Sequence, residues 1–216
     1  MLVKYCNDDC QRQDWRKHKP HCITKEEQVR RKGLSEELFT ASGRGDVRAM
    51  TALAAQGADI NYVCAEIHGM TPLIAAALRA RFAIIDALVV AGVRVNAVMT
   101  DGYSALSMAC QFGYNKEQQD LARQAGMSCE SMGLRLVNTL IAAGANANIV
   151  SSCGSSPLTL SCQLDHPSVV DALIKAVANA NHTRHNGVTS LFVASQFGSV
   201  ETVRLLLAAG ANVNNA

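Results

Sequence analysis

A five-residue motif that ends in asparagine recurs along this chain and constrains its fold more than any other feature. Its copies span residues 57–61, 92–96, 144–148, 177–181 and 210–214, and four of the five begin with glycine. A second motif, Thr or Ser followed by one residue and leucine, occurs at Thr71, Ser104, Ser156 and Thr189. Two pairs of these openings are 33 residues apart, and the middle pair is 52 apart, which is 33 plus 19. A period of this length indicates a stack of similar units.

The sequence pattern of each unit predicts two short helices joined by a turn. The hydroxyl of Thr or Ser caps the start of the first helix, and proline suits its first turn, as at Thr71 and Pro72. A glycine such as Gly92 ends the second helix because it accepts the left-handed backbone conformation. The chain holds 32 alanines and only 5% aromatic residues, which suits thin, closely packed helices. One unit cannot bury its apolar face, so the units must stack.

The period, the Thr-Pro-Leu openings and the motif endings resemble the ankyrin repeat, whose signature is Thr-Pro-Leu-His-x-Ala. The resemblance implies an all-α solenoid of about five helix-turn-helix repeats with short hairpin connections over residues 34–216. We expect the repeats at residues 34–66, 67–99, 100–151, 152–184 and 185–216. The signature histidine is replaced by Ile74, Ser107, Thr159 and Phe192. These replacements put in question the hydrogen bonds that the histidine makes between repeats in the family.

The third repeat carries the 19 extra residues, which we place near 114–132, between its two helices. Residues 115–124 predict a mostly polar helix. The insert is either a contact element for a partner or a solvated addition at a tolerant site, and the second is favoured because loops accept insertions at little cost. The last repeat is apolar in its second helix, whereas terminal repeats need a polar outer face. Either a partner covers this face or the parent chain continues.

The first 33 residues differ in composition from the rest. They carry nine basic and five acidic residues, none of the alanines, and the single tryptophan, Trp15. We therefore expect a small N-terminal module at residues 1–24, followed by a charged helical linker at 25–33 that ends at Gly33.

Four soft metal ligands lie close together in this module: Cys6, Cys10, His18 and Cys22. Cysteine thiolates and histidine imidazoles are the ligands of tetrahedral zinc, and the spacing is C-x3-C-x7-H-x3-C. A chance cluster of packed thiols is disfavoured, because so small a module with little apolar surface needs a metal to hold it together. The pattern predicts that zinc is the cofactor.

Residues 5–22 also resemble the second half of a MYND-type zinc finger. The matching residues are Tyr5, Cys6, Cys10, Gln11, Asp14, Trp15, His18, Lys19 and Cys22. A full finger of this family has eight ligands and two zinc ions, so the resemblance implies that Cys6 and Cys10 serve one zinc and that His18 and Cys22 serve the other. Their partner cysteines would precede Met1 in a longer parent chain. Three outcomes stay open: a truncated finger, one zinc shared by all four ligands, or two empty half-sites.

The family resemblance further implies a groove for proline-rich peptides at Gln11 and Trp15, which are four residues apart and share a helix face. Trp15 is equally suited to form the small core of the finger, and the two roles are compatible. The basic residues of this segment, Arg12, Arg16, Lys17 and Lys19, suit phosphate contact, but a solvated helix face is their more common role.

No catalytic motif is found: the chain has no nucleophile elbow, phosphate-binding loop or zinc-protease motif. It also has no apolar run long enough to span a membrane and no secretory signal. Its eight cysteines then favour the cytoplasm or nucleus, where thiols stay reduced.

These features predict a non-enzymatic scaffold or adaptor that binds protein partners through the solenoid and zinc through the finger. The alternatives are a regulatory fragment of a larger, methyltransferase-type enzyme, or a transcriptional co-regulator that contacts nucleic acid. The net charge of only +2 disfavours nucleic acid as the partner of the whole surface.

Overall fold

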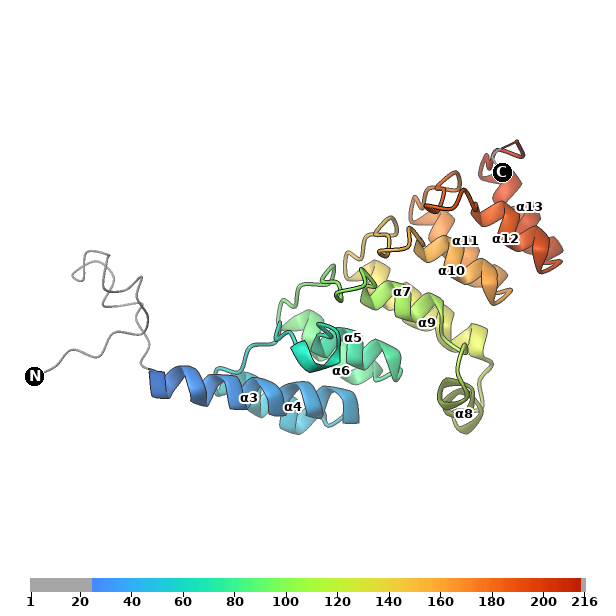
Figure 1. The fold of residues 1–216 in the computed structure, drawn as a ribbon. Helices are drawn as coiled ribbons and strands as arrows, with labels where there is room; N and C mark the ends of the chain where they lie inside the picture. The colour runs from blue at the N-terminus through green and yellow to red at the C-terminus, as the bar shows by residue number, and fades with distance from the viewer. Residues whose placement is uncertain (1–24, 215–216) are drawn as a thin grey trace, which may run out of the picture.

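The structure of the chain is a computed structural model that describes residues 25–214. Paired antiparallel helices follow one another along a curved stack (Figure 1). The helices are α3 (Lys25–Arg44), α4 (Val47–Ala55), η2 (Ala65–Ile67), α5 (Pro72–Leu78), α6 (Phe82–Val90), α7 (Ala105–Cys110), α8 (Lys116–Gln124), α9 (Cys129–Ala142), α10 (Pro157–Gln163), α11 (Pro167–Lys175), α12 (Ser190–Gln196) and α13 (Val200–Ala208). In this part of the chain β-structure is limited to isolated bridges, so the predicted all-α solenoid is confirmed.

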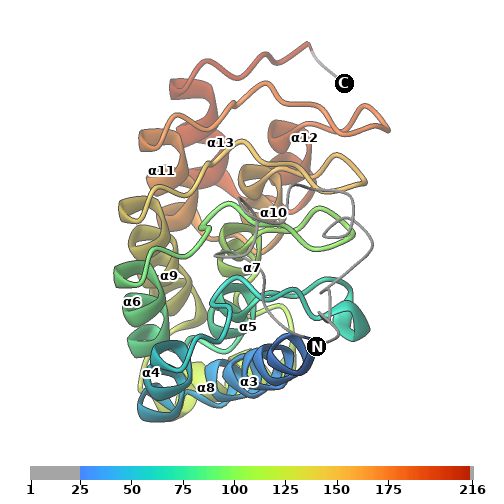
Figure 2. The same cartoon turned by 90° about the vertical axis from the view of Figure 1, so that its left-hand side faces the viewer.

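The helices form two rows. The first helices of the repeats, α3, α5, α7, α10 and α12, make one row, and the second helices, α4, α6, α9, α11 and α13, make the other (Figure 2). Hairpin loops extend past the first helices on the side away from the second helices (Figure 2). Three of these hairpins are closed by antiparallel bridges, among them Cys64 with Met70. One face of the stack therefore consists of first helices and hairpins.

Hydroxyl caps start the first helices, as the sequence predicts. Thr71 accepts a hydrogen bond from the backbone N–H of Ile74 at 3.3 Å, and Ser156 accepts one from Thr159 at 3.2 Å. Ser104 and Thr189 act in the same way. All four hydroxyl residues are buried. The cap therefore satisfies a backbone donor that water could not reach.

The asparagine motifs join each repeat to the next. Asn148 accepts a hydrogen bond from the backbone N–H of Asn179 at 2.8 Å and donates one to the carbonyl oxygen of Val177 at 3.0 Å. Asn96 and Asn181 repeat this pair of bonds with the following repeat. Asn61 accepts from the backbone N–H of Arg94 at 2.7 Å. A single residue type at one register position thus links successive repeats.

A buried hydroxyl pair replaces the signature histidine at one junction. The Thr159 hydroxyl lies 2.9 Å from that of Ser156 in its own repeat and 3.0 Å from that of Ser190 in the next. All three residues are buried. Thr159 therefore makes a contact between repeats without an imidazole, because Ser190 carries a hydroxyl where proline opens two other repeats.

One hydrophobic core runs through the stack. It consists mostly of leucine, isoleucine, valine and alanine, and Phe112 is its largest fully buried side chain. The alanines Ala75, Ala76 and Ala77 of α5 are almost completely buried. Small side chains at these positions let neighbouring first helices approach closely, since cores fill to near-crystalline density.

Gly33 does not end a helix, contrary to the sequence prediction. α3 continues through it from Lys25 to Arg44, so residues 25–33 are part of the first helix of the stack. A glycine inside a helix costs about 1 kcal/mol relative to alanine. Burial of Leu38 in the core contributes about 1.5–3 kcal/mol in the other direction. Tertiary packing outweighs the local stop signal.

The inserted segment forms the polar helix α8 and the first turn of α9, which is 14 residues long where other second helices have 9. Gln118 of α8 is buried, and its side-chain amide bridges the end of α5 and the turn after α7. It donates to the carbonyl oxygen of Leu78 at 3.2 Å and accepts from the backbone N–H of Gly113 at 2.9 Å. The insert is therefore hydrogen-bonded to the preceding repeat as well as to its own.

Val177 stands where the other four motifs have glycine, and its φ is 62°, in the left-handed region. This conformation costs a residue with a side chain about 1–2 kcal/mol. A glycine at this position would remove the strain, but its greater freedom in the unfolded chain would offset part of the gain. Because the Val177 side chain is 80% exposed, replacing it loses little burial. We expect Val177→Gly to raise the free energy of unfolding by about 1 kcal/mol in a urea titration.

The matched control is Gly144→Val, which places the same side chain at an equivalent position with φ of 89°. We expect it to lower the free energy of unfolding by at least about 1 kcal/mol. A destabilised Val177→Gly variant would contradict the left-handed conformation of residue 177.

Candidate functional site

All site residues predicted from the sequence lie outside the described residues: Cys6, Cys10, Gln11, Trp15, His18 and Cys22. Their chemistry can still be compared with that of the implied metal. Three thiols and one imidazole form a donor set that zinc prefers in structural sites. Zinc binding by these four residues, and peptide binding by Gln11 and Trp15, therefore stay predictions.

The face made by first helices and hairpins carries a groove of about 650 Å³ between α3 and α5. Its walls include the apolar side chains of Ile67 and Leu78. Three arginines, Arg44, Arg79 and Arg81, also line it. No local motif in the sequence marks this groove, because its residues come from the end of one repeat's helix and from the hairpin, first helix and turn of the next.

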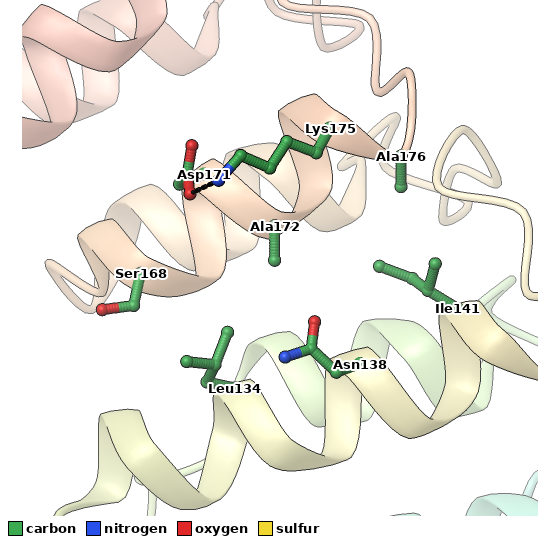
Figure 3. Close-up of a pocket in the computed structure, with 8 residues that line it drawn as sticks. All are labelled: Leu134, Asn138, Ile141, Ser168, Asp171, Ala172, Lys175 and Ala176. Atoms are coloured by element: carbon green, nitrogen blue, oxygen red, sulfur yellow. Dashed lines mark hydrogen bonds and ion pairs between the residues drawn. The ribbon is translucent and has the colours of Figure 1, made fainter.

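A second groove, of about 470 Å³, lies between the second helices α9 and α11 (Figure 3). The aliphatic side chains of Leu134 and Ile141 lie on one side of it, and Ala172 faces them from α11 (Figure 3). On its rim Lys175 Nζ lies 2.6 Å from Asp171 Oδ2. Since these two charges are one turn apart and neutralise each other, the groove offers a ligand an apolar strip with little net charge.

The last repeat exposes apolar side chains, as the sequence predicts. Phe192, Leu207 and Val213 are between 44% and 66% exposed and border a groove of about 310 Å³. Phe192 occupies the position of the signature histidine. The last described repeat therefore presents an apolar surface beside its two helices.

Two cysteines that align in successive repeats, Cys110 and Cys162, are fully buried in the core. Burial raises the pKa of both thiols, that of Cys162 to about 12, so they pack as small apolar side chains. Cys153 is different because it is exposed in a loop. The hydroxyls of Ser151 and Ser155 each lie 3.1 Å from its sulfur and lower its pKa to about 7.

A loop histidine, His182, has a structural partner. His182 Nε2 donates to the carbonyl oxygen of Gly154 at 2.7 Å and so joins two hairpins. Over residues 25–214, no group of three or more His, Cys, Asp or Glu side chains is arranged to hold a metal ion. Within the same residues, none of the helices has the length and apolar character needed to cross a membrane.

Comparison with protein families agrees with both resemblances. A family model described as ankyrin repeats (3 copies) matches residues 38–123 and 126–216, and one described as MYND finger matches residues 1–22. No curated protein matches the chain. The two matches together cover most of the described stack, from residue 38 on, and the segment that holds the predicted zinc ligands.

The lowered pKa of Cys153 predicts selective alkylation. Thiolate is the nucleophile, so the rate at Cys153 should rise with pH around a midpoint near 7, below the midpoint of an ordinary thiol. Peptide mass spectrometry after timed iodoacetamide treatment measures this rate at each cysteine of the native protein. Ser155→Ala should move the Cys153 midpoint to higher pH, because it removes a hydrogen bond to the thiolate.

Cys110 and Cys162 serve as internal controls and should stay unmodified until the protein is denatured. A Cys153 rate that follows the pH profile of an unperturbed thiol, in the wild type and in Ser155→Ala alike, would contradict the role of the two hydroxyls.

Proposed function

Since the chain belongs to the ankyrin-repeat family, we propose that it is a scaffold or adaptor that binds protein partners through the face formed by its first helices and hairpins. The observation that carries this proposal is the single core that runs through the stack. It makes that face one preorganised surface, and preorganisation lowers the entropy lost on binding.

The size of this face suits a protein partner. Five first helices lie side by side, and packed helices are about 8–10 Å apart, so the row is about 40 Å long. A standard protein interface takes about 800 Å² from each partner, which a surface of this length can supply. The groove between α3 and α5 adds a concave element within it.

The N-terminal segment adds a second module to the proposal. We propose that Cys6, Cys10, His18 and Cys22 hold zinc and that Gln11 and Trp15 contact a proline-rich peptide. Zinc would supply folding free energy rather than catalysis. Because α3 begins at Lys25 and continues into the stack, no flexible connection separates residue 25 from the solenoid. Two weak sites on one chain gain avidity when one partner reaches both.

We place this activity in the cytoplasm or nucleus. The proposal is supported by the thiols of the described residues, where Cys64, Cys110, Cys129, Cys153 and Cys162 are all free. Free thiols in this number are typical of a reducing compartment.

Zinc content tests the finger. We expect metal analysis of the purified chain to find about one zinc per molecule, because four thiolate and imidazole ligands complete one tetrahedral site. Cys6→Ala and Cys22→Ala should each lose it, since a site with three of its four ligands binds far more weakly. The matched control Cys153→Ala removes an exposed thiol of the stack and should keep the metal. A metal-free wild-type chain would contradict zinc binding by these four residues and leave the proposal for the stack intact.

Quantitative affinity capture tests the solenoid face. Ile67→Glu changes an exposed residue of a hairpin, and Val90→Glu makes the same kind of change at the end of a second helix. We expect the wild type and Val90→Glu to capture the same proteins. The captured amount of these proteins should be at least tenfold lower on Ile67→Glu, since a charge in an interface leaves a desolvated group without a partner. Both variants should keep the wild-type melting temperature. A set of captured proteins that does not differ between the two variants would contradict binding through this face.

A further inference from the structure

The groove between α3 and α5 combines apolar walls with positive charge. Phe39 of α3, Ile67 and Met70 of the hairpin and Leu78 of α5 supply the apolar part. None of its lining residues belongs to a second helix. The groove therefore opens on the same face that we propose for partner binding, and at about 650 Å³ it falls in the range of specific ligand sites.

Two of its arginines are held over the end of α3. A Cβ atom on Gly43 would lie 2.9 Å from Arg79 Nη1, and one on Gly45 would lie 2.9 Å from Arg81 Cδ. The guanidinium of Arg81 points its Nε toward the carbonyl oxygen of Gly43 at 3.5 Å. The two glycines thus let both arginines approach a helix C-terminus, where the helix dipole favours positive charge.

The third arginine, Arg44, lies in the last turn of α3 itself, where the helix dipole also favours its charge. In the part of the chain that the structure describes, it makes no ion pair and no side-chain hydrogen bond. It is exposed at the last turn of α3. Its guanidinium remains available to a partner.

Among the described residues, the lining of this groove contains three arginines and no acidic side chain. Within residues 25–214, Arg79 alone of the three arginines has a carboxylate partner, with Nε lying 3.5 Å from Oε1 of Glu117 on α8. Three acids, Glu36, Glu37 and Asp46, share with Arg44 a separate pocket between α3 and α4 and do not line this groove. Of these, Asp46 caps α4, and Glu36 contacts Tyr62 and Lys32. Like charges that border one groove repel each other in the free protein. The same charges become favourable when a ligand supplies carboxylates.

We propose that this groove binds a linear peptide segment of a protein partner in which two or more carboxylates flank a bulky apolar side chain. The inference rests on the proposed function and names the chemistry of the partner. The apolar side chain lies against Ile67 and Leu78, and one carboxylate pairs with Arg44. Arginine forms two parallel hydrogen bonds with a carboxylate, which gives direction as well as binding free energy.

Selection of random peptides displayed on phage, with the full-length chain as bait, tests this. Peptides that bind the wild type should be enriched in Asp and Glu next to Leu, Ile or Phe. As synthetic peptides they should bind Arg44→Gln on the order of tenfold more weakly, as expected for loss of a charge-assisted bond. The matched control is Arg204→Gln, which removes one exposed arginine from α13 and should bind like the wild type. All three proteins should have the same melting temperature.

Glu117→Gln distinguishes peptide binding by the arginines from a merely structural role. Because it releases Arg79 from its carboxylate partner, it should strengthen binding of the same peptides severalfold, and added salt should weaken binding to every variant. Unchanged or weaker binding by Glu117→Gln would overturn the proposal.

Selected peptides without acidic residues, or peptides that bind Arg44→Gln as tightly as the wild type, would overturn the inference while leaving solenoid binding intact. Failure to enrich any peptide on the wild type would also overturn it, and the capture experiment with Ile67→Glu then decides the proposed function separately. Displacement of the peptides by a DNA duplex, with the same dependence on Arg44, would assign the groove to phosphate instead.

Discussion

Every part of this stack depends on contacts between neighbouring repeats. A pair of helices such as α5 and α6 has too little volume to enclose a core, so residues such as Ile74 and Ile85 are fully buried only because adjacent repeats cover them. Hydrophobic burial is not directional and does not by itself set the register of one repeat on the next. The asparagine motif supplies that register through paired bonds such as those of Asn148 to the backbone of the next repeat.

Burial supplies the stability and the asparagine bonds set the register, and together they allow the stack to accommodate departures from a regular repeat. The additional helix α8 lies outside the two rows, and it is held by the buried amide of Gln118 rather than by a large apolar surface. The junction that lacks the signature histidine at Thr159 is joined instead by a hydroxyl contact with Ser190. In both cases buried polar groups find partners across a repeat boundary, as groups removed from water must.

The proposed binding surface follows from the same architecture. First helices and hairpins of different repeats are brought side by side, so residues far apart in the chain, such as Arg44 and Arg81, border one groove. The close approach that Gly43 and Gly45 permit is part of this arrangement. A rigid stack can hold unbalanced charges of this kind because its stability comes from the core and from the contacts between repeats.

The sequence alone determined the local and periodic features. The cap at Thr71, the glycine at Gly92 and the spacing of the asparagines are short-range signals, and they predicted the helices, their ends and the solenoid class. The spacing of Cys6, Cys10, His18 and Cys22 likewise predicted a zinc module whose geometry lies outside the described residues.

Tertiary structure decided what depends on neighbours. Helix α3 continues through Gly33, because the free energy gained by burying Leu38 outweighs the cost of one glycine inside a helix. Tertiary structure also placed Arg44 and Arg79 around one groove. Local signals act through the backbone of a few adjacent residues. A groove is formed by side chains of different repeats, which come together only when those repeats stack.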